Sequence, residues 1–299
     1  MRSVFRDASG GVRNGWKILG CLALTGALLA ALSFVQGLLP KSVRWFLPGA
    51  HWAFAAALLA SWACVRWERE PLASLGLKLD GRWVRDMVVG TSGGTALLGS
   101  VAAGVWLAGG FELTRTQDAG LGLVLRAAWM MWGAALFEEV LFRGYVFQRL
   151  IRGVGERWAQ GVVAVLFCLA HPFQAQMSAS TQALAMLNTF LAGLLLGLCY
   201  LRTRSLALPV GVHLGWNWAM NCLGFSVSGN SFKGFWTPVY LDRPEWLTGG
   251  EYGLEGSVIG VVLLLVAVVA MALWKGTASA DVSRGGKHEA DQAVGHPVT

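Results

Sequence analysis

Charged residues are scarce in this sequence. Only 14% of its 299 residues are Asp, Glu, Lys or Arg, whereas 55% are hydrophobic and the mean hydropathy is +0.52. A soluble domain carries about 25% charged residues, so this balance predicts a polytopic membrane protein. The net charge of +7 does not indicate nucleic-acid binding, because the basic residues fall between apolar runs and form no single basic face.

Motifs that would indicate other classes of protein are also missing from the sequence. It has no HExxH zinc-protease motif, no P-loop and no Ser/His/Asp order. The cysteines are odd in number, lie in apolar stretches and show no CxxC spacing, so neither a disulfide framework nor a cysteine metal site is predicted. They are Cys21, Cys64, Cys168, Cys199 and Cys222.

The sequence is instead dominated by long apolar runs, several of them close to the ~20 residues that cross a bilayer. The runs cover about 17–39, 48–65, 86–109, 121–148, 158–171, 182–201, 206–226 and 254–274. A signal peptide is the alternative for the first run. Further spans follow it and no small-residue cleavage site closes it, so we interpret it as a retained span.

These runs predict an all-α bundle of about eight transmembrane helices. We expect a cytoplasmic segment at 1–16, a membrane-embedded domain at 17–275 with a motif-bearing core at about 121–226, and a disordered cytoplasmic tail at 276–299. Lys and Arg concentrate in alternate loops, which by the positive-inside rule places both termini in the cytoplasm. The chain is therefore expected to be a multi-pass integral membrane protein, in the inner membrane if it is bacterial.

The fourth run contains three ionisable residues, Glu138, Glu139 and Arg143. Ionisable groups at membrane depth are costly, which makes this trio a functional-site hypothesis. The alternative is that the trio lies in interfacial water and only anchors the segment. Glu139 and Arg143 are spaced i,i+4 with the acid first, the preferred order for a helical ion pair. Glu138 is turned about 100° away and is freer to act as a base.

Two further polar sets occur on later runs: His171 on the fifth, and His213 with Asn217 on the seventh. Counted from the basic flank of each run at about 1.5 Å per residue, these residues and the two glutamates all lie roughly 14 to 21 Å deep. This agreement favours one shared site, although each histidine taken alone could be structural. Carboxylate, imidazole and amide groups together predict hydrolysis of an amide bond by activated water.

Three motifs carry a resemblance to a known family. Residues 138–143 fit EExxxR, residues 167–171 fit FxxxH, and residues 213–217 fit HxxxN. In this order and spacing they resemble the CPBP family of intramembrane endopeptidases, which includes type II CAAX prenyl endopeptidases and bacteriocin-processing or immunity (Abi-like) proteins. The motif-bearing region covers about 121–226.

The resemblance implies roles for the polar residues. Glu138, helped by His171, would activate the attacking water, and His213 and Asn217 would form the oxyanion hole. The substrate would be a lipidated or membrane-anchored protein or peptide, cleaved near its C-terminus within the lipid bilayer.

The resemblance also implies that Glu139 and Arg143 organise the site. It leaves open whether the chemistry depends on glutamate alone or on a Zn²⁺ ion bound through Glu138, His171 and His213. Competing functions are a non-catalytic membrane scaffold or bacteriocin-immunity protein, and a transporter. Intact motifs argue against the first, and the lack of an inverted repeat argues against the second.

Overall fold

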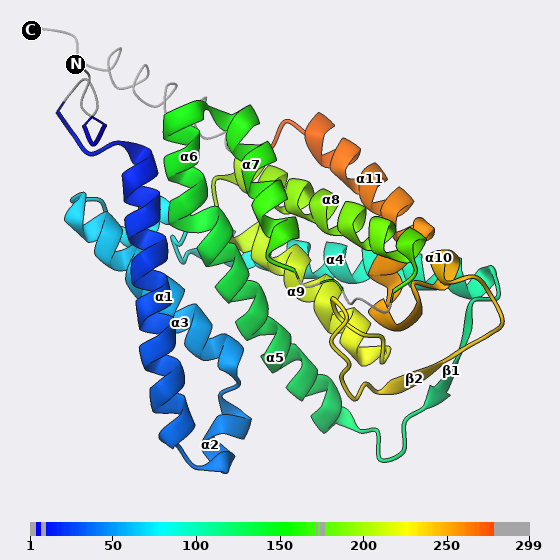
Figure 1. The fold of residues 1–299 in the computed structure, drawn as a ribbon. Helices are drawn as coiled ribbons and strands as arrows, with labels where there is room; N and C mark the ends of the chain where they lie inside the picture. The colour runs from blue at the N-terminus through cyan, green and yellow to red at the C-terminus, as the bar shows by residue number, and fades with distance from the viewer. Residues whose placement is uncertain (1–3, 7–9, 172, 174–176, 278–299) are drawn as a thin grey trace, which may run out of the picture.

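The helices of the chain follow its apolar runs (Figure 1). In a computed structural model, residues 4–6, 10–171, 173 and 177–277 are described, so most of the tail predicted to be disordered lies outside the described residues. The helices are α1 (Asn14–Leu38), α2 (Lys41–Phe46), α3 (Gly49–Trp67), α4 (Gly81–Leu107), α5 (Leu121–Glu139), α6 (Phe147–Val154), α7 (Glu156–Leu169), α8 (Ala179–Thr203), α9 (Ala207–Cys222), α10 (Glu245–Thr248) and α11 (Val258–Leu273). Short 3₁₀ turns are η1 (Leu72–Leu75), η3 (Gly250–Tyr252) and η4 (Leu254–Gly256), and η2 (Val140–Val146) is a π-helical turn between α5 and α6.

The predicted helical membrane bundle is confirmed. Within the described part of the chain, four helical segments are long and apolar enough to cross a membrane: α1, α4, the continuous stretch from α5 to α6, and α8. α11 is apolar but shorter. Each of the eight predicted runs contains a helix, while the number of crossings and the location of the termini stay predictions. Figure 1 shows α1 and α3 along one edge of the bundle, α8 and α11 along the opposite edge, and α5 between them.

α4 and α9 pack with their backbones nearly in contact, because small residues face each other at i,i+4 spacing. A Cβ added to Gly94 of α4 would lie 2.1 Å from the Val212 carbonyl oxygen of α9. The reverse holds on α9, where a Cβ on Gly211 would lie 2.5 Å from the Met87 carbonyl oxygen. Small residues at such positions allow close helix approach in membranes. The contact fixes α9, which carries His213 and Asn217.

Polar contacts gather several helix ends at one end of the bundle. Lys17 at the start of α1 lies 2.8 Å from Glu68, which follows α3. Arg82 at the start of α4 donates to the Thr203 carbonyl at the end of α8, at 3.4 Å. Arg204 after α8 pairs with Glu156 at the start of α7. By the positive-inside rule the basic loops at 66–85, 149–157 and 202–204 are predicted to be cytoplasmic, and residues of all three gather here.

A buried arginine joins α6 to the end of α3 in the same region. Arg149 is fully buried and lies 3.0 Å from Glu68 and 3.1 Å from Glu70. Arg152, half exposed, also pairs with Glu70 at 2.7 Å. Arg152 and Arg149 lower the pKa of Glu70 to about 2, against the opposing effect of partial burial. The stabilisation from the Glu70 carboxylate is thus present above its unfolded pKa of about 4.3 and is lost as the pH falls towards 2.

Residues 223–257 form a separate region, which we call the cap. It contains β2 (Trp236–Tyr240), which pairs antiparallel with β1 (Phe111–Arg115) between Phe111–Tyr240 and Arg115–Trp236. Between the apolar runs at 206–226 and 254–274 the sequence predicts only a loop of about 25 residues. Its structure depends on contacts with β1, which lies far away in the sequence.

The α4–α9 contact predicts opposite effects for two neighbouring glycines. Gly94→Ala should lower the free energy of unfolding by about 1–3 kcal/mol, because its methyl group meets backbone that cannot rotate away. Gly93→Ala is the matched control, since a Cβ there meets nothing within 4 Å. Alanine favours a helix over glycine by up to about 1 kcal/mol, so this variant should melt no earlier than wild type. Thermal unfolding in detergent checks both, and equal melting of the two variants would contradict the packing.

The buried arginine predicts a second contrast. Arg149→Ala should destabilise the protein by about 3–5 kcal/mol, because it leaves two partly buried carboxylates without their shared partner. Arg152→Ala removes an exposed pair with one of the same carboxylates and should cost about 0–1 kcal/mol. Chemical denaturation in micelles measures both changes. A larger loss for Arg152→Ala than for Arg149→Ala would refute this assignment.

Candidate active site

The two glutamates lie where α5 passes into the π-helical turn η2. Glu139 is the last residue of α5, and Arg143 lies within η2, four residues on. Gly144 departs from helical geometry with a ψ of −116°, so the backbone is locally irregular just after the motif. Single π-helical turns inside longer helices are frequent at functional sites.

The predicted ion pair between Glu139 and Arg143 is present, and it is fully buried. Arg143 Nη1 donates to Glu139 Oε1 at 3.0 Å, and both side chains have 0% exposure. Arg143 Nη2 donates to the Gly193 carbonyl of α8 at 3.1 Å. The guanidinium carbon also lies 4.4 Å from the centre of the Phe167 ring on α7. One side chain therefore connects η2, α7 and α8.

The same glutamate also holds His213. The Nδ1 atom of His213 lies 2.9 Å from Glu139 Oε1, so this oxygen accepts from both the imidazole and Arg143. Because a carboxylate paired with arginine acts as an acceptor, Nδ1 of His213 carries the proton. Glu139 thereby fixes the orientation of the imidazole, and the other ring nitrogen faces Glu138.

Glu138 lies beside two imidazoles without touching either one. Its Oε2 is 3.7 Å from His171 Nε2 and 3.8 Å from His213 Nε2, and this buried oxygen has no hydrogen-bond partner among the described residues. His171 Nδ1 lies 2.7 Å from the Phe167 carbonyl oxygen, which can only accept, so Nδ1 carries the proton there as well. When the imidazoles carry a proton on Nδ1 alone, Glu138 Oε2 and the two Nε2 atoms are three acceptors that face one another. A water molecule bound to these atoms would supply the hydrogen-bond donor that they lack.

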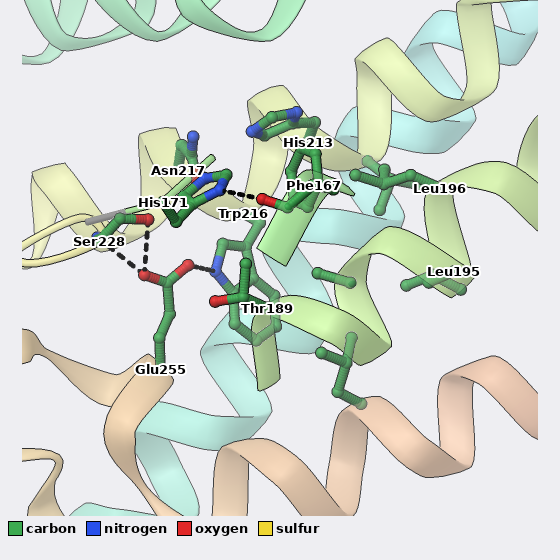
Figure 2. Close-up of a pocket in the computed structure, with 13 residues that line it drawn as sticks. Phe167, His171, Thr189, Leu195, Leu196, His213, Trp216, Asn217, Ser228 and Glu255 are labelled. Carbon is green, nitrogen blue, oxygen red and sulfur yellow. Dashed lines mark hydrogen bonds between the residues drawn. The ribbon is translucent and has the colours of Figure 1, made fainter. Parts of the chain in front are cut away.

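Two cavities meet at these residues. The larger, of about 400 Å³, is lined on one side by Glu138, His171, His213 and Asn217. Its remaining lining is mostly apolar: Met131, Ala134, Phe137, Leu141, Phe142, Ala170, Val227, Ser228, Asn230 and Phe232. Figure 2 shows the smaller one, of about 40 Å³, in which His171 and Asn217 face Ser228 and Glu255.

The six predicted site residues all fall within this region. Five are linked by the contacts above, and Asn217 follows His213 by one turn of α9 and lines both cavities. Of the remaining histidines, the ring of His51 stacks on Trp129 with centroids 4.2 Å apart, while His288 and His296 lie outside the described residues.

Sequence reasoning missed two residues of the site, Ser228 and Glu255. Both belong to the cap. Ser228 lies in the loop between the last two apolar runs, and Glu255 is a single charge at the start of the last run. No spacing or periodicity in the sequence could have connected them to α9.

The predicted Zn²⁺ ligands are Glu138, His171 and His213. Among the residues that the structure describes, no group of three or more His, Cys, Asp or Glu side chains is arranged to hold a metal ion. Glu138, His171 and His213 converge, with Glu138 Oε2 at 3.7 and 3.8 Å from the two Nε2 atoms. The binding of Zn²⁺ by these three residues stays a prediction.

Comparison with known families bears on the same region. Residues 120–219, about a third of the chain, match the family described as Type II CAAX prenyl endopeptidase Rce1-like. The resemblance to CPBP endopeptidases is therefore confirmed for these residues. A search of curated proteins finds no match to the chain.

The segment that matches the endopeptidase family contains all six predicted site residues, from Glu138 to Asn217. The match connects this segment with an endopeptidase family. The cap lies outside the segment, so the walls of the cavities combine residues of the family segment with residues specific to the rest of this chain.

The buried ion pair predicts the behaviour of Arg143→Ala. Removing the guanidinium leaves Glu139 as an unpaired charge in an apolar interior, which should cost about 3–5 kcal/mol of stability and also abolish turnover. Arg143→Lys keeps the charge but not the forked donors, so its loss should be smaller. Thermal unfolding in detergent is the measurement. Equal melting of Arg143→Ala and wild type would remove the ion pair from this account.

Proposed function

We propose that the chain is an intramembrane endopeptidase that hydrolyses a peptide bond near the C-terminus of a lipidated or membrane-anchored protein or peptide. One observation carries the proposal: the unpartnered Glu138 oxygen between His171 Nε2 and His213 Nε2. A carboxylate beside a space for water, inside a segment of an endopeptidase family, is the arrangement that a general base requires.

The first step places a water molecule between Glu138 and the imidazoles. Glu138 removes one proton from the water as its oxygen attacks the carbonyl carbon of the peptide bond, and His171 orients the water through Nε2. The bond between the water oxygen and the carbonyl carbon forms, and negative charge develops on the carbonyl oxygen.

Two groups on α9 can stabilise that negative charge. Asn217 supplies an amide N–H from the cavity wall. His213 can donate from Nε2 only when both ring nitrogens are protonated, and the Glu139 carboxylate at 2.9 Å from Nδ1 compensates the resulting positive charge. The intermediate then collapses as the carbon–nitrogen bond breaks. The leaving amine takes the proton from Glu138, which restores the carboxylate.

The larger cavity agrees with an apolar substrate. Met131, Phe137, Leu141 and Phe142 line it on the side of α5 and η2, and Phe232 lines it from the cap. Such a surface accommodates hydrophobic side chains or a lipid group next to the scissile bond. We further place the chain as a multi-pass protein with both termini in the cytoplasm, supported by the basic residues gathered at one end of the bundle. In a bacterium, the inner membrane would then be its location.

Glu138→Gln tests the proposal in cells. The amide cannot accept a proton from water, so cleavage should be abolished, while melting in detergent should change little because Oε2 has no partner to lose. We would compare the termini of membrane proteins in cells that express wild type or this variant at equal levels. Glu112→Gln, which changes an exposed carboxylate on β1, is the matched control and should behave as wild type.

New C-termini or released peptides should appear with wild type and Glu112→Gln and be absent with Glu138→Gln. They would also identify the substrate. Identical termini in all three strains would contradict an endopeptidase and favour a scaffold or immunity function without cleavage.

A further inference from the structure

Glu255 is a half-buried carboxylate that joins the cap to the site. It lies on η4, outside the family segment, and both of its oxygens accept hydrogen bonds. Oε1 accepts from the indole nitrogen of Trp216 at 3.0 Å, and Oε2 accepts from the backbone nitrogen and hydroxyl of Ser228 at 2.8 and 3.2 Å. Figure 2 shows these bonds beside His171 and Asn217. The proposed chemistry does not use this carboxylate.

Ser228 occupies a backbone conformation that needs support. Its φ is +49°, and the following Gly229 has a φ of +76°. Val227 and Asn230 close the turn with two backbone hydrogen bonds of 2.9 Å. Glycine is at ease at positive φ, whereas a serine there costs free energy unless neighbouring interactions offset it. The two bonds to the Glu255 carboxylate are such interactions, because charge-assisted hydrogen bonds are the stronger kind.

The turn is part of the wall around the reacting atoms. Val227, Ser228 and Asn230 line the larger cavity together with Glu138. The other partner of Glu255, Trp216, directly precedes Asn217 on α9 and lines the smaller cavity. One carboxylate therefore fixes two parts of the cavity walls, from a position 39 and 27 residues further along the chain.

We propose that Glu255 is a positioning residue, which holds the Ser228 turn and Trp216 so that the cavity aligns the substrate peptide against Glu138. The inference rests on the proposed endopeptidase function. It adds to the site a residue that lies outside the segment matched by the family. Because Glu255 acts through the walls, its loss should weaken substrate binding and leave the chemistry of bound substrate intact.

The test compares wild type with Glu255→Gln in detergent micelles. The probe is a prenylated peptide ending in a CAAX sequence, with a fluorophore and a quencher on either side of the scissile bond. Glutamine keeps the shape but cannot accept from both Trp216 and Ser228 as the carboxylate does. KM should rise about tenfold, as expected for lost charge-assisted hydrogen bonds, with kcat within about twofold and an unchanged pH profile. Glu251→Gln, an exposed carboxylate in the same cap, is the control and should keep the wild-type KM.

A rescue variant separates positioning from a general loss of structure. Glycine accepts the positive φ of position 228 without support, so Ser228→Gly added to Glu255→Gln should recover part of the lost affinity. A loss of kcat with unchanged KM, an unchanged KM in Glu255→Gln, or a failure of the glycine to lower KM would each overturn the proposal.

Binding of the same peptide distinguishes this inference from the proposed function. Fluorescence anisotropy would compare Glu138→Gln with the double variant Glu138→Gln/Glu255→Gln, neither of which needs to cleave. About tenfold weaker binding by the double variant would support positioning by Glu255. This result would hold even if wild type cleaved no peptide, and the lack of cleavage would then contradict only the proposed protease function. Equal binding, or no binding by either variant, would overturn the role of Glu255 itself.

Discussion

A guanidinium in the apolar interior of a helical bundle is the constraint on which the site depends. Arg143 is fully buried, and such a charge persists only when opposite charge and hydrogen-bond acceptors surround it. Glu139, the Gly193 carbonyl and the face of the Phe167 ring supply these partners, while the Arg143 Nε atom has no hydrogen-bond partner among the described residues. Each acceptor comes from a different segment, so satisfying Arg143 fixes the relative positions of α5, η2, α7 and α8. The pair is better explained as a device for specificity than as a source of net stability.

The fixed pair then assigns different tasks to two adjacent carboxylates. Glu139 is occupied by Arg143 and by His213, and through His213 it extends the network to α9. Glu138 is left with an unpartnered oxygen facing two imidazole nitrogens. Small residues make the arrangement compatible with packing. Gly193 brings α8 within reach of α7, since a Cβ there would lie 2.9 Å from the Ala164 Cα. Gly94 and Gly211 do the same for α4 and α9.

Much of this could be predicted from the sequence, because it depends on local spacing. The apolar runs predict the helices, and the i,i+4 spacing of Glu139 and Arg143 predicts their pair. Counting depth from the basic flanks predicts that the two glutamates, the histidines and Asn217 share one level of the bundle. The contact between His213 and Glu139 could not be predicted, because depth gives a level but no direction around a helix axis.

The cap shows a different limit of sequence reasoning. Its turn at Ser228, its strand and its carboxylate at Glu255 are defined by partners 27 to 129 residues away, such as Trp216 and β1. Residues 223–257 have no long apolar periodicity, so the sequence indicates only a polar loop. The pairing of Arg149 with Glu68 and Glu70 could not be predicted for the same reason, because these partners lie 81 and 79 residues away in the sequence.

The central claim is that Glu139 is structural and Glu138 is chemical, and the thermal unfolding of Glu139→Gln tests it most directly. Glutamine at 139 leaves the buried Arg143 without its compensating charge. The account predicts a large drop in melting temperature in detergent for this variant, measured beside Glu138→Gln, which should melt close to wild type. Similar melting of the two variants, or a larger drop for Glu138→Gln, would contradict the division of roles between the two glutamates.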